Sequence, residues 1–316
     1  MTMWADASSE GWGAHCGDIS TGGRWLTVEK ILHINILEIK AIYFGLKTLC
    51  NGQTNIHVRV KSDNTTAVAY INNMGGIKSI ACDEVVKELW EWCIERNIWV
   101  SAEHLPGVLN VIADTESRNF NDNTEWMLDR LVFTQVLNRF GQVEIDLFAS
   151  RLNKQCDNFV SWRPDPDASF IDAFSCSWNN LKFYAFPPFS LVNKVLGKIL
   201  RDQAEGILLV PLWMGQPWFP RLMKLLVDNP ILLPLDVLNL PHKEGKHPLH
   251  KKLRILACRV SGSMLNARTY RQMLMNSSLH HGVIQQRRSI AAILKDGWLS
   301  VLEGKLIPIT ILKKQS

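Results

Sequence analysis

The order of strands and helices predicted over residues 3–118 limits the fold more than any other feature of the chain. Residues 3–27 alternate as a meander of three short strands, with a turn signal at residues 20–23. Hydrophobic periodicity predicts the later elements, in chain order: helix 36–49, strand 56–60, helices 64–71 and 80–96, strand 98–102 and helix 111–118. The order βββ-α-β-α-α-β-α places a mixed five-stranded sheet between helices.

Four acids lie on this framework where they could converge. Asp6 is on the first strand, Glu38 in the first helix, Asp63 directly after the fourth strand, and Asp114 in the last helix. A single acid near a strand end is more often a turn or cap residue. Four acids in this order instead predict a two-metal nuclease, because paired cations about 3.5–4 Å apart need several carboxylates at one point. Oxygen ligands suit Mg²⁺ or Mn²⁺.

Short motifs surround each of the four acids. They are Asp6-Ala7-Ser8 with Gly11-Trp12-Gly13-Ala14, Asn35-Ile36-Leu37-Glu38, Lys61-Ser62-Asp63-Asn64 with Ala67, and His104-Leu105-Pro106-Gly107 with Asn110, Ala113-Asp114 and Ser117-Arg118. Together, these motifs resemble the ribonuclease H domain of reverse-transcribing elements, and most closely that of DIRS-type retrotransposons. The resemblance implies a ribonuclease H-like fold for residues 1–120.

The same resemblance implies an activity and a set of site residues. It implies hydrolysis of the RNA strand of RNA–DNA hybrids, with Asp6, Glu38, Asp63 and Asp114 as ligands of Mg²⁺ (or Mn²⁺). It assigns His104 to a mobile loop that helps proton transfer or product release, whereas His104 taken alone would be a polar loop residue. A physical basis for hybrid selectivity is recognition of 2′-hydroxyls and of an intermediate groove width.

The chain is expected to be a fragment of a longer polyprotein. Only five residues precede Asp6, and no Tyr-x-Asp-Asp polymerase signature occurs. The expected partners are therefore an RNA–DNA hybrid and the adjacent reverse transcriptase and recombinase modules of a parent element.

Residues 121–140 are predicted to be a linker helix, and residues 141–240 a second α/β module. Its motifs are Glu144-Ile145-Asp146-Leu147-Phe148-Ala149-Ser150, then Phe186-Pro187-Pro188-Phe189 and Ile207-Leu208-Leu209-Val210-Pro211. They resemble a degenerate phage-type DNA adenine methyltransferase, in which an acid such as Asp146 contacts S-adenosylmethionine and the Pro-Pro loop holds a flipped adenine. Phe186 stands where that loop has a polar residue, so a non-catalytic nucleic-acid-binding or scaffolding module is the preferred interpretation.

Residues 241–316 are predicted to be a basic, mostly helical tail or linker. They carry 14 Lys and Arg against 3 Asp and Glu, which favours phosphate contacts or a solvated face. No apolar run is long enough to span a bilayer, and the N-terminus lacks a signal-peptide pattern. We therefore expect a soluble protein without a membrane partner, intracellular and located in the cytoplasm, the nucleus or both.

Three functions follow in order of preference. The first is a retroelement ribonuclease H. The second is a catalytically inactive or domesticated nucleic-acid-binding fragment of a retrotransposon polyprotein. The third, less favoured, is a DNA adenine methyltransferase.

Overall fold

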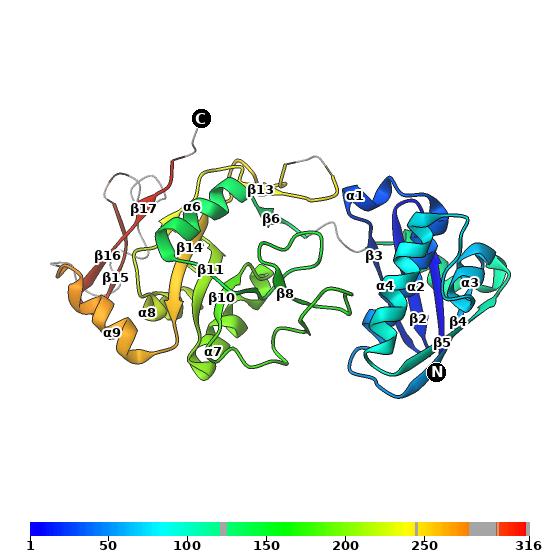
Figure 1. Cartoon of the computed structure of the whole chain (residues 1–316). Helices are drawn as coiled ribbons and strands as arrows, with labels where there is room; N and C mark the ends of the chain where they lie inside the picture. The colour runs from blue at the N-terminus through cyan, green and yellow to red at the C-terminus, as the bar shows by residue number, and fades with distance from the viewer. Residues whose placement is uncertain (121–124, 244–245, 278–294, 296, 314–316) are drawn as a thin grey trace. The chain divides into compact units, whose positions relative to one another are not determined.

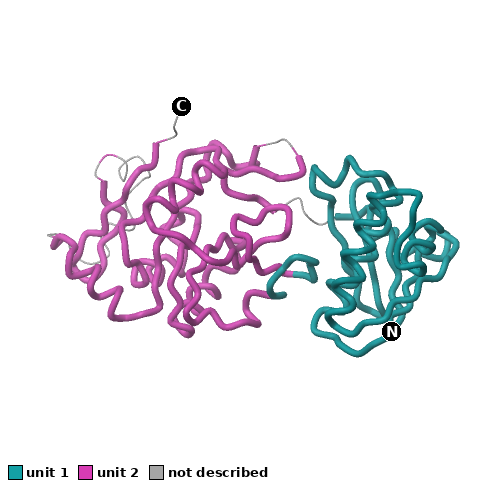
Figure 2. Tube along the Cα trace, viewed as in Figure 1, with its two compact units in different colours: residues 1–124, 163–171 teal, residues 125–162, 172–316 magenta. Residues whose placement is uncertain are grey.

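The order of elements predicted for residues 3–118 is present in the computed structural model, which describes residues 1–120, 125–243, 246–277, 295 and 297–313 (Figure 1). Contacts divide the chain into two units (Figure 2). Unit 1 comprises Met1–Thr124 and Arg163–Ile171, and unit 2 comprises Glu125–Trp162 and Asp172–Ser316. The segment Arg163–Ile171 is attached to unit 1 by an ion pair between Lys47 Nζ and Asp167 Oδ1, 2.8 Å apart.

Unit 1 contains a five-stranded sheet in the order β3-β2-β1-β4-β5. Strand β1 is antiparallel to β2 and parallel to β4, and β4 is parallel to β5, so the predicted mixed sheet is confirmed. The elements are β1 (Thr2–Ala7), β2 (Gly11–Cys16), β3 (Ile19–Arg24), α1 (Thr27–Lys30), α2 (Ile34–Leu49), β4 (Ile56–Ser62), α3 (Thr65–Asn72), α4 (Ile80–Ile94), β5 (Ile98–His104), the 3₁₀ turn η1 (Gly107–Leu109) and α5 (Val111–Arg118).

Alternation along β1 separates the core of unit 1 from its candidate site. Met3 and Ala5 are fully buried in the apolar cluster that includes Ile39 and Ile42 of α2. Successive side chains of a strand point to opposite faces, so Asp6 lies on the other face from Ala5. Helix α5 contacts β1, β2 and β3, and it therefore packs beside Asp6.

The predicted turn at residues 20–23 is wrong. The chain turns instead at Gly17, whose φ of +57° is easily adopted by glycine, and residues 20–23 lie inside β3. Gly22 has a packing role: a Cβ there would lie 2.7 Å from the backbone oxygen of Glu116 in α5. Small residues at this position allow α5 to approach the sheet closely.

Unit 2 contains a second sheet, with strands in the order β17-β12-β14-β11-β10-β7-β8. Strands β8, β7, β10 and β11 are parallel, whereas β14 is antiparallel to both β11 and β12. The remaining elements of the chain are β6 (Met127–Leu128), α6 (Arg130–Phe140), β7 (Ile145–Asp146), β8 (Asn158–Ser161), β9 (Phe170–Ile171), β10 (Lys182–Ala185), η2 (Phe189–Leu191), α7 (Val192–Asp202), β11 (Glu205–Pro211), α8 (Phe219–Leu225), β12 (Ile231–Leu232), β13 (Leu238–Asn239), β14 (Ile255–Ser261), α9 (Met264–Met273), β15 (Trp298–Leu302), β16 (Lys305–Pro308) and β17 (Thr310–Ile311).

Two predictions for the chain after residue 120 are wrong. The described part of residues 241–316 is not a mostly helical tail, because β14 lies between β11 and β12 in the sheet of unit 2. The predicted linker helix 121–140 begins only at Arg130, and its apolar face is buried in the same cluster as Tyr184, so α6 belongs to unit 2. Residues 121–124 lie outside the described residues. Among the described helices, none has the length and apolar character to cross a membrane.

Candidate metal centre

Three of the four predicted acids converge in unit 1. Asp6, Glu38 and Asp63 each offer a carboxylate oxygen, and these oxygens lie within 4.8 Å of one another. Asp6 and Asp63 meet because β1 and β4 are parallel neighbours, so their carboxyl ends lie at the same edge of the sheet. Helix α2 adds Glu38 from its second turn. Asp6 and Glu38 are buried, and Asp63 is the most accessible of the three.

Burial raises the pKa of Asp6 and of Glu38, the two buried acids of the group. Desolvation by burial raises the pKa of Glu38 to about 9, and repulsion from the charges of Asp6 and Asp63 adds to the rise. Desolvation also raises the pKa of Asp6 to about 6, although a hydrogen bond from Ser117 opposes the rise. Glu38 Oε2 is buried without a hydrogen-bond partner among the described residues. An oxygen-only donor set with an unsatisfied buried oxygen fits a hard divalent cation.

Helix α5 supports this group through hydroxyl and amide contacts. Ser117 Oγ donates a hydrogen bond of 2.8 Å to Asp6 Oδ2, and Ser8 Oγ donates one of 2.6 Å to the backbone oxygen of Ser117. Asn110, directly before α5, donates from Nδ2 to the backbone oxygen of Ala5 at 2.9 Å. The sequence alone indicated no role for Ser117. Because Ser117 lies three residues after Asp114 on the same helix, this spacing could have predicted that it faces the acid group.

Asp114 lies in the first turn of α5, as predicted, but it is not a member of the acid group. Its Oδ1 accepts a charge-assisted hydrogen bond of 2.7 Å from Arg118 Nε. Its charge nevertheless contributes to the raised pKa of Asp6. Asp114 therefore lies beside the acid group and forms an ion pair with Arg118 of its own helix.

His104 is the last residue of β5 and not a loop residue, which corrects its predicted place. It is exposed and aligned with Ser62, the residue before Asp63. The loop that follows packs against the acid group, since a Cβ at Gly107 would lie 2.8 Å from Asp63 Oδ2. His104 therefore stands on the strand next to one of the three acids.

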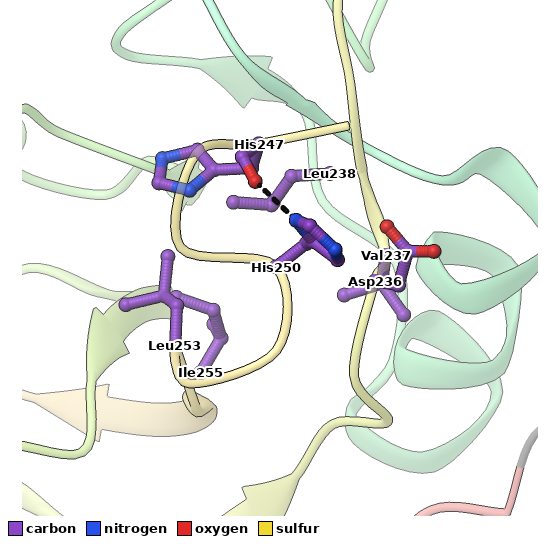
Figure 3. A pocket seen from close by; sticks show the side chains of 7 residues that line it. All are labelled: Asp236, Val237, Leu238, His247, His250, Leu253 and Ile255. Carbon is purple, nitrogen blue, oxygen red and sulfur yellow. Dashed lines mark hydrogen bonds between the residues drawn. The ribbon is translucent and has the colours of Figure 1, made fainter. Parts of the chain in front are cut away.

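A pocket in unit 2 has a different character (Figure 3). It is lined by Asp236, Val237, Leu238, His247, His250, Leu253 and Ile255. Its cavity volume is only about 10 Å³, roughly the space that one water molecule needs. Its two histidines are engaged with the local backbone, with His250 Nδ1 2.9 Å from the backbone oxygen of His247. Of the described residues, only the group in unit 1 brings three such ligand atoms together.

Asp146 ends strand β7, as expected for the second module, but it is only 2% exposed. Its two oxygens accept backbone N–H groups, Oδ1 from Phe148 at 3.2 Å and Oδ2 from Gln155 at 3.1 Å. Burial raises its pKa to about 7. Phe186 packs against the apolar cluster that contains Tyr184. Asp146 therefore stabilises the loop that follows β7.

A mixed five-stranded sheet with clustered carboxylates at one edge defines unit 1 as an α/β unit with a candidate divalent-cation site. Several solved structures resemble part of the chain, among them the following three. Ribonuclease H1 from the archaeon Halobacterium salinarum NRC-1 matches 36% of this chain and 92% of its own, at 16% identity and a TM-score of 0.30. LC11-RNase H1 in complex with an RNA/DNA hybrid matches 36% of this chain and 91% of its own, at 17% identity and a TM-score of 0.30. The N-terminal RNase H domain of a Mycobacterium tuberculosis protein matches 37% of this chain and 95% of its own, at 14% identity and a TM-score of 0.29. No protein-family model and no curated protein matches the chain.

Proposed function

We propose that unit 1 is a divalent-cation-dependent nuclease of the ribonuclease H type, which hydrolyses the RNA strand of RNA–DNA hybrids. The observation that carries the proposal is the convergence of Asp6, Glu38 and Asp63, whose oxygens lie within 4.8 Å of one another. Burying Asp6 and Glu38 beside a third acid costs stability unless a cation neutralises them. Such an arrangement is a common sign of a functional site.

Each residue has a role in this proposal. Asp6, Glu38 and Asp63 hold Mg²⁺ (or Mn²⁺), and Asp114 joins them from α5. When bound, the cations supply an activated water and stabilise the leaving 3′ oxygen. Ser117 keeps Asp6 oriented through its 2.8 Å hydrogen bond. His104, exposed at the end of β5, helps to move a proton or release the product.

The retroelement origin is also a proposal, and the motifs around the acids support it. In that setting, unit 1 acts beside reverse transcriptase and recombinase modules, and its partner is the hybrid produced by reverse transcription. Selectivity for the hybrid over duplex DNA would come from contacts to 2′-hydroxyls.

The test is cleavage of an RNA strand labelled at its 5′ end, paired with DNA, in Mg²⁺ or Mn²⁺. Duplex RNA and duplex DNA of the same sequence serve as competing substrates. Asp63→Asn should abolish cleavage, whereas Glu84→Gln, which removes an exposed acid of α4, should not. If the wild-type chain cleaves no hybrid in either metal but still binds it, the inactive nucleic-acid-binding alternative replaces the enzyme.

For unit 2 we propose a non-catalytic nucleic-acid-binding or scaffolding role. Both oxygens of Asp146 are occupied by loop N–H groups, so this acid has lost the accessibility needed to accept a hydrogen bond from a cofactor hydroxyl. Calorimetric titration with S-adenosylmethionine tests this role. Saturable binding would support the methyltransferase alternative.

A further inference from the structure

The inference concerns Arg118, the last residue of α5, and it rests on the proposed function. Arg118 Nε contacts Asp114 Oδ1 at 2.7 Å across one helical turn. The Arg118 side chain is 60% exposed and that of Asp114 is 44% exposed. Both side chains of the pair are therefore accessible to solvent.

The field of the acid group also acts on Arg118. Besides its ion pair with Asp114, the guanidinium interacts with the charges of Asp6 and Asp63. Arg118 is therefore a basic side chain that the acid group already attracts. A fixed positive charge here partly satisfies the acids, as a divalent cation would.

The backbone of α5 is already in close contact with the sheet. Cβ atoms at Gly13 and Gly22 would lie 2.2 Å and 2.7 Å from backbone oxygens of α5, so helix and sheet are already in close contact. Ser117 is fully buried and bonded to Asp6. Asp114 can approach the group only by changing its side-chain torsions, and that change breaks the contact with Arg118.

We propose that Arg118 is a positioning residue that acts as an internal counter-cation and competes with a second divalent cation for Asp114. The triad of Asp6, Glu38 and Asp63 takes the first cation with α5 unchanged. The second cation needs Asp114, and it binds more weakly because Asp114 must first leave Arg118. The two cations therefore bind in a fixed order set by the chain itself.

The size of the effect follows from the exposure of the pair. Exposed ion pairs at i and i+4 are weak, and removing one positive charge beside several acids adds to the gain. Loss of Arg118 should strengthen binding of the second cation about three- to fivefold. The gain should shrink in 0.5 M salt because screening weakens both contributions.

The experiment is titration of the full chain with Mn²⁺ in the absence of nucleic acid, with free Mn²⁺ followed by its electron paramagnetic resonance signal. The wild type should bind one ion tightly and a second more weakly. Arg118→Gln should strengthen the second step about three- to fivefold and the first step by less, while Arg118→Lys keeps the second step weak. Asp114→Asn should lose the second step alone. Arg96→Gln, which removes an arginine paired with its neighbour Glu95, is the control and should change neither step.

The outcomes separate this inference from the proposed function. Two Mn²⁺ ions with affinities unchanged in Arg118→Gln, or strengthened equally at both steps, overturn the competition while leaving the metal site intact. A wild-type chain that binds no Mn²⁺ overturns the proposed function and the inference with it. The readout is metal binding, so cleavage activity does not decide it.

Discussion

Replacement of Glu38 by Gln should make the metal-free protein more stable at alkaline pH. The folded-state pKa of Glu38 is about 9, against an ordinary value of 4.5. Between these pH values the folded state holds a proton that the unfolded state has lost, so the free energy of unfolding falls as pH rises through this range. At roughly 1.4 kcal/mol per pKa unit, keeping Glu38 protonated while the unfolded state has lost this proton costs the folded state about 5 kcal/mol at pH 8.5. Glutamine has the same shape and no charge.

The assay is urea unfolding in EDTA at pH 5 and pH 8.5. Hydrogen-exchange pulse labelling, read in peptides from α2, reports unit 1 separately from unit 2. We expect the wild type and Glu38→Gln to unfold at similar urea concentrations at pH 5, because Glu38 is then protonated. At pH 8.5 the variant should be the more stable. Mg²⁺ should stabilise the wild type at pH 8.5 and have little effect on the variant, because ligand binding to the folded state alone adds to stability.

Glu84→Gln is the matched control, since it removes an exposed acid of α4 in the same unit. Its effect should stay within about 0.5 kcal/mol at both pH values. The reasoning is refuted if the difference between wild type and Glu38→Gln is the same at pH 5 and pH 8.5. That result would mean that Glu38 ionises freely in the folded protein and is not held in a desolvated acid group.

Three further predictions concern the supports of the site and unit 2. Gly13→Ala should destabilise unit 1 by at least about 3 kcal/mol in urea unfolding, because its Cβ would lie 2.2 Å from a backbone oxygen of α5. Gly23→Ala is the control and should cost much less, because the nearest neighbour of its Cβ is a side-chain atom at 3.3 Å. Equal costs for the two variants would contradict the argument. Ser117→Ala should shift the acid limb of the pH–rate profile to higher pH, because the lost hydrogen bond no longer lowers the pKa of Asp6; an unshifted limb would show that Asp6 does not control it. Asp146→Asn should remove the fall in the stability of unit 2 that the wild type shows between about pH 4 and pH 7, where the folded state holds a proton that the unfolded state has lost. Hydrogen exchange in β10 peptides measures this, and a wild-type stability that does not fall over this range would contradict it.

The sequence predicted the elements of unit 1 well where periodicity was clear. Helix α5 has the predicted bounds, Val111–Arg118. Strand β4 runs two residues beyond the predicted end because Lys61 and Ser62 pair with residues of β5. The turn at residues 20–23 was mispredicted because Gly22 permits close packing of α5 rather than a change of chain direction. Local sequence cannot distinguish these two uses of glycine.

Unit 2 was harder to predict because composition concealed a strand. Strand β14 is buried and lies between two other strands of the sheet, but its sequence follows a run of lysines and histidines that suggested a solvated tail. An antiparallel strand that enters a sheet after a long connection leaves no local signal of its partners. Its seven residues Ile255–Ser261 contain one arginine, and that residue is paired with Glu205 across the neighbouring strand.

The candidate site also shows why four acids in order do not establish four ligands. Spacing predicted that the acids would converge, and three of them do. The exception is Asp114, whose carboxylate forms an ion pair with Arg118, one helical turn further along α5. The glycines of β2 and β3 bring α5 against the sheet, so one helix both bonds Asp6 through Ser117 and holds Asp114 aside through Arg118. A change at Gly13 should therefore disturb Asp6 and Asp114 together, although Gly13 itself carries no functional group.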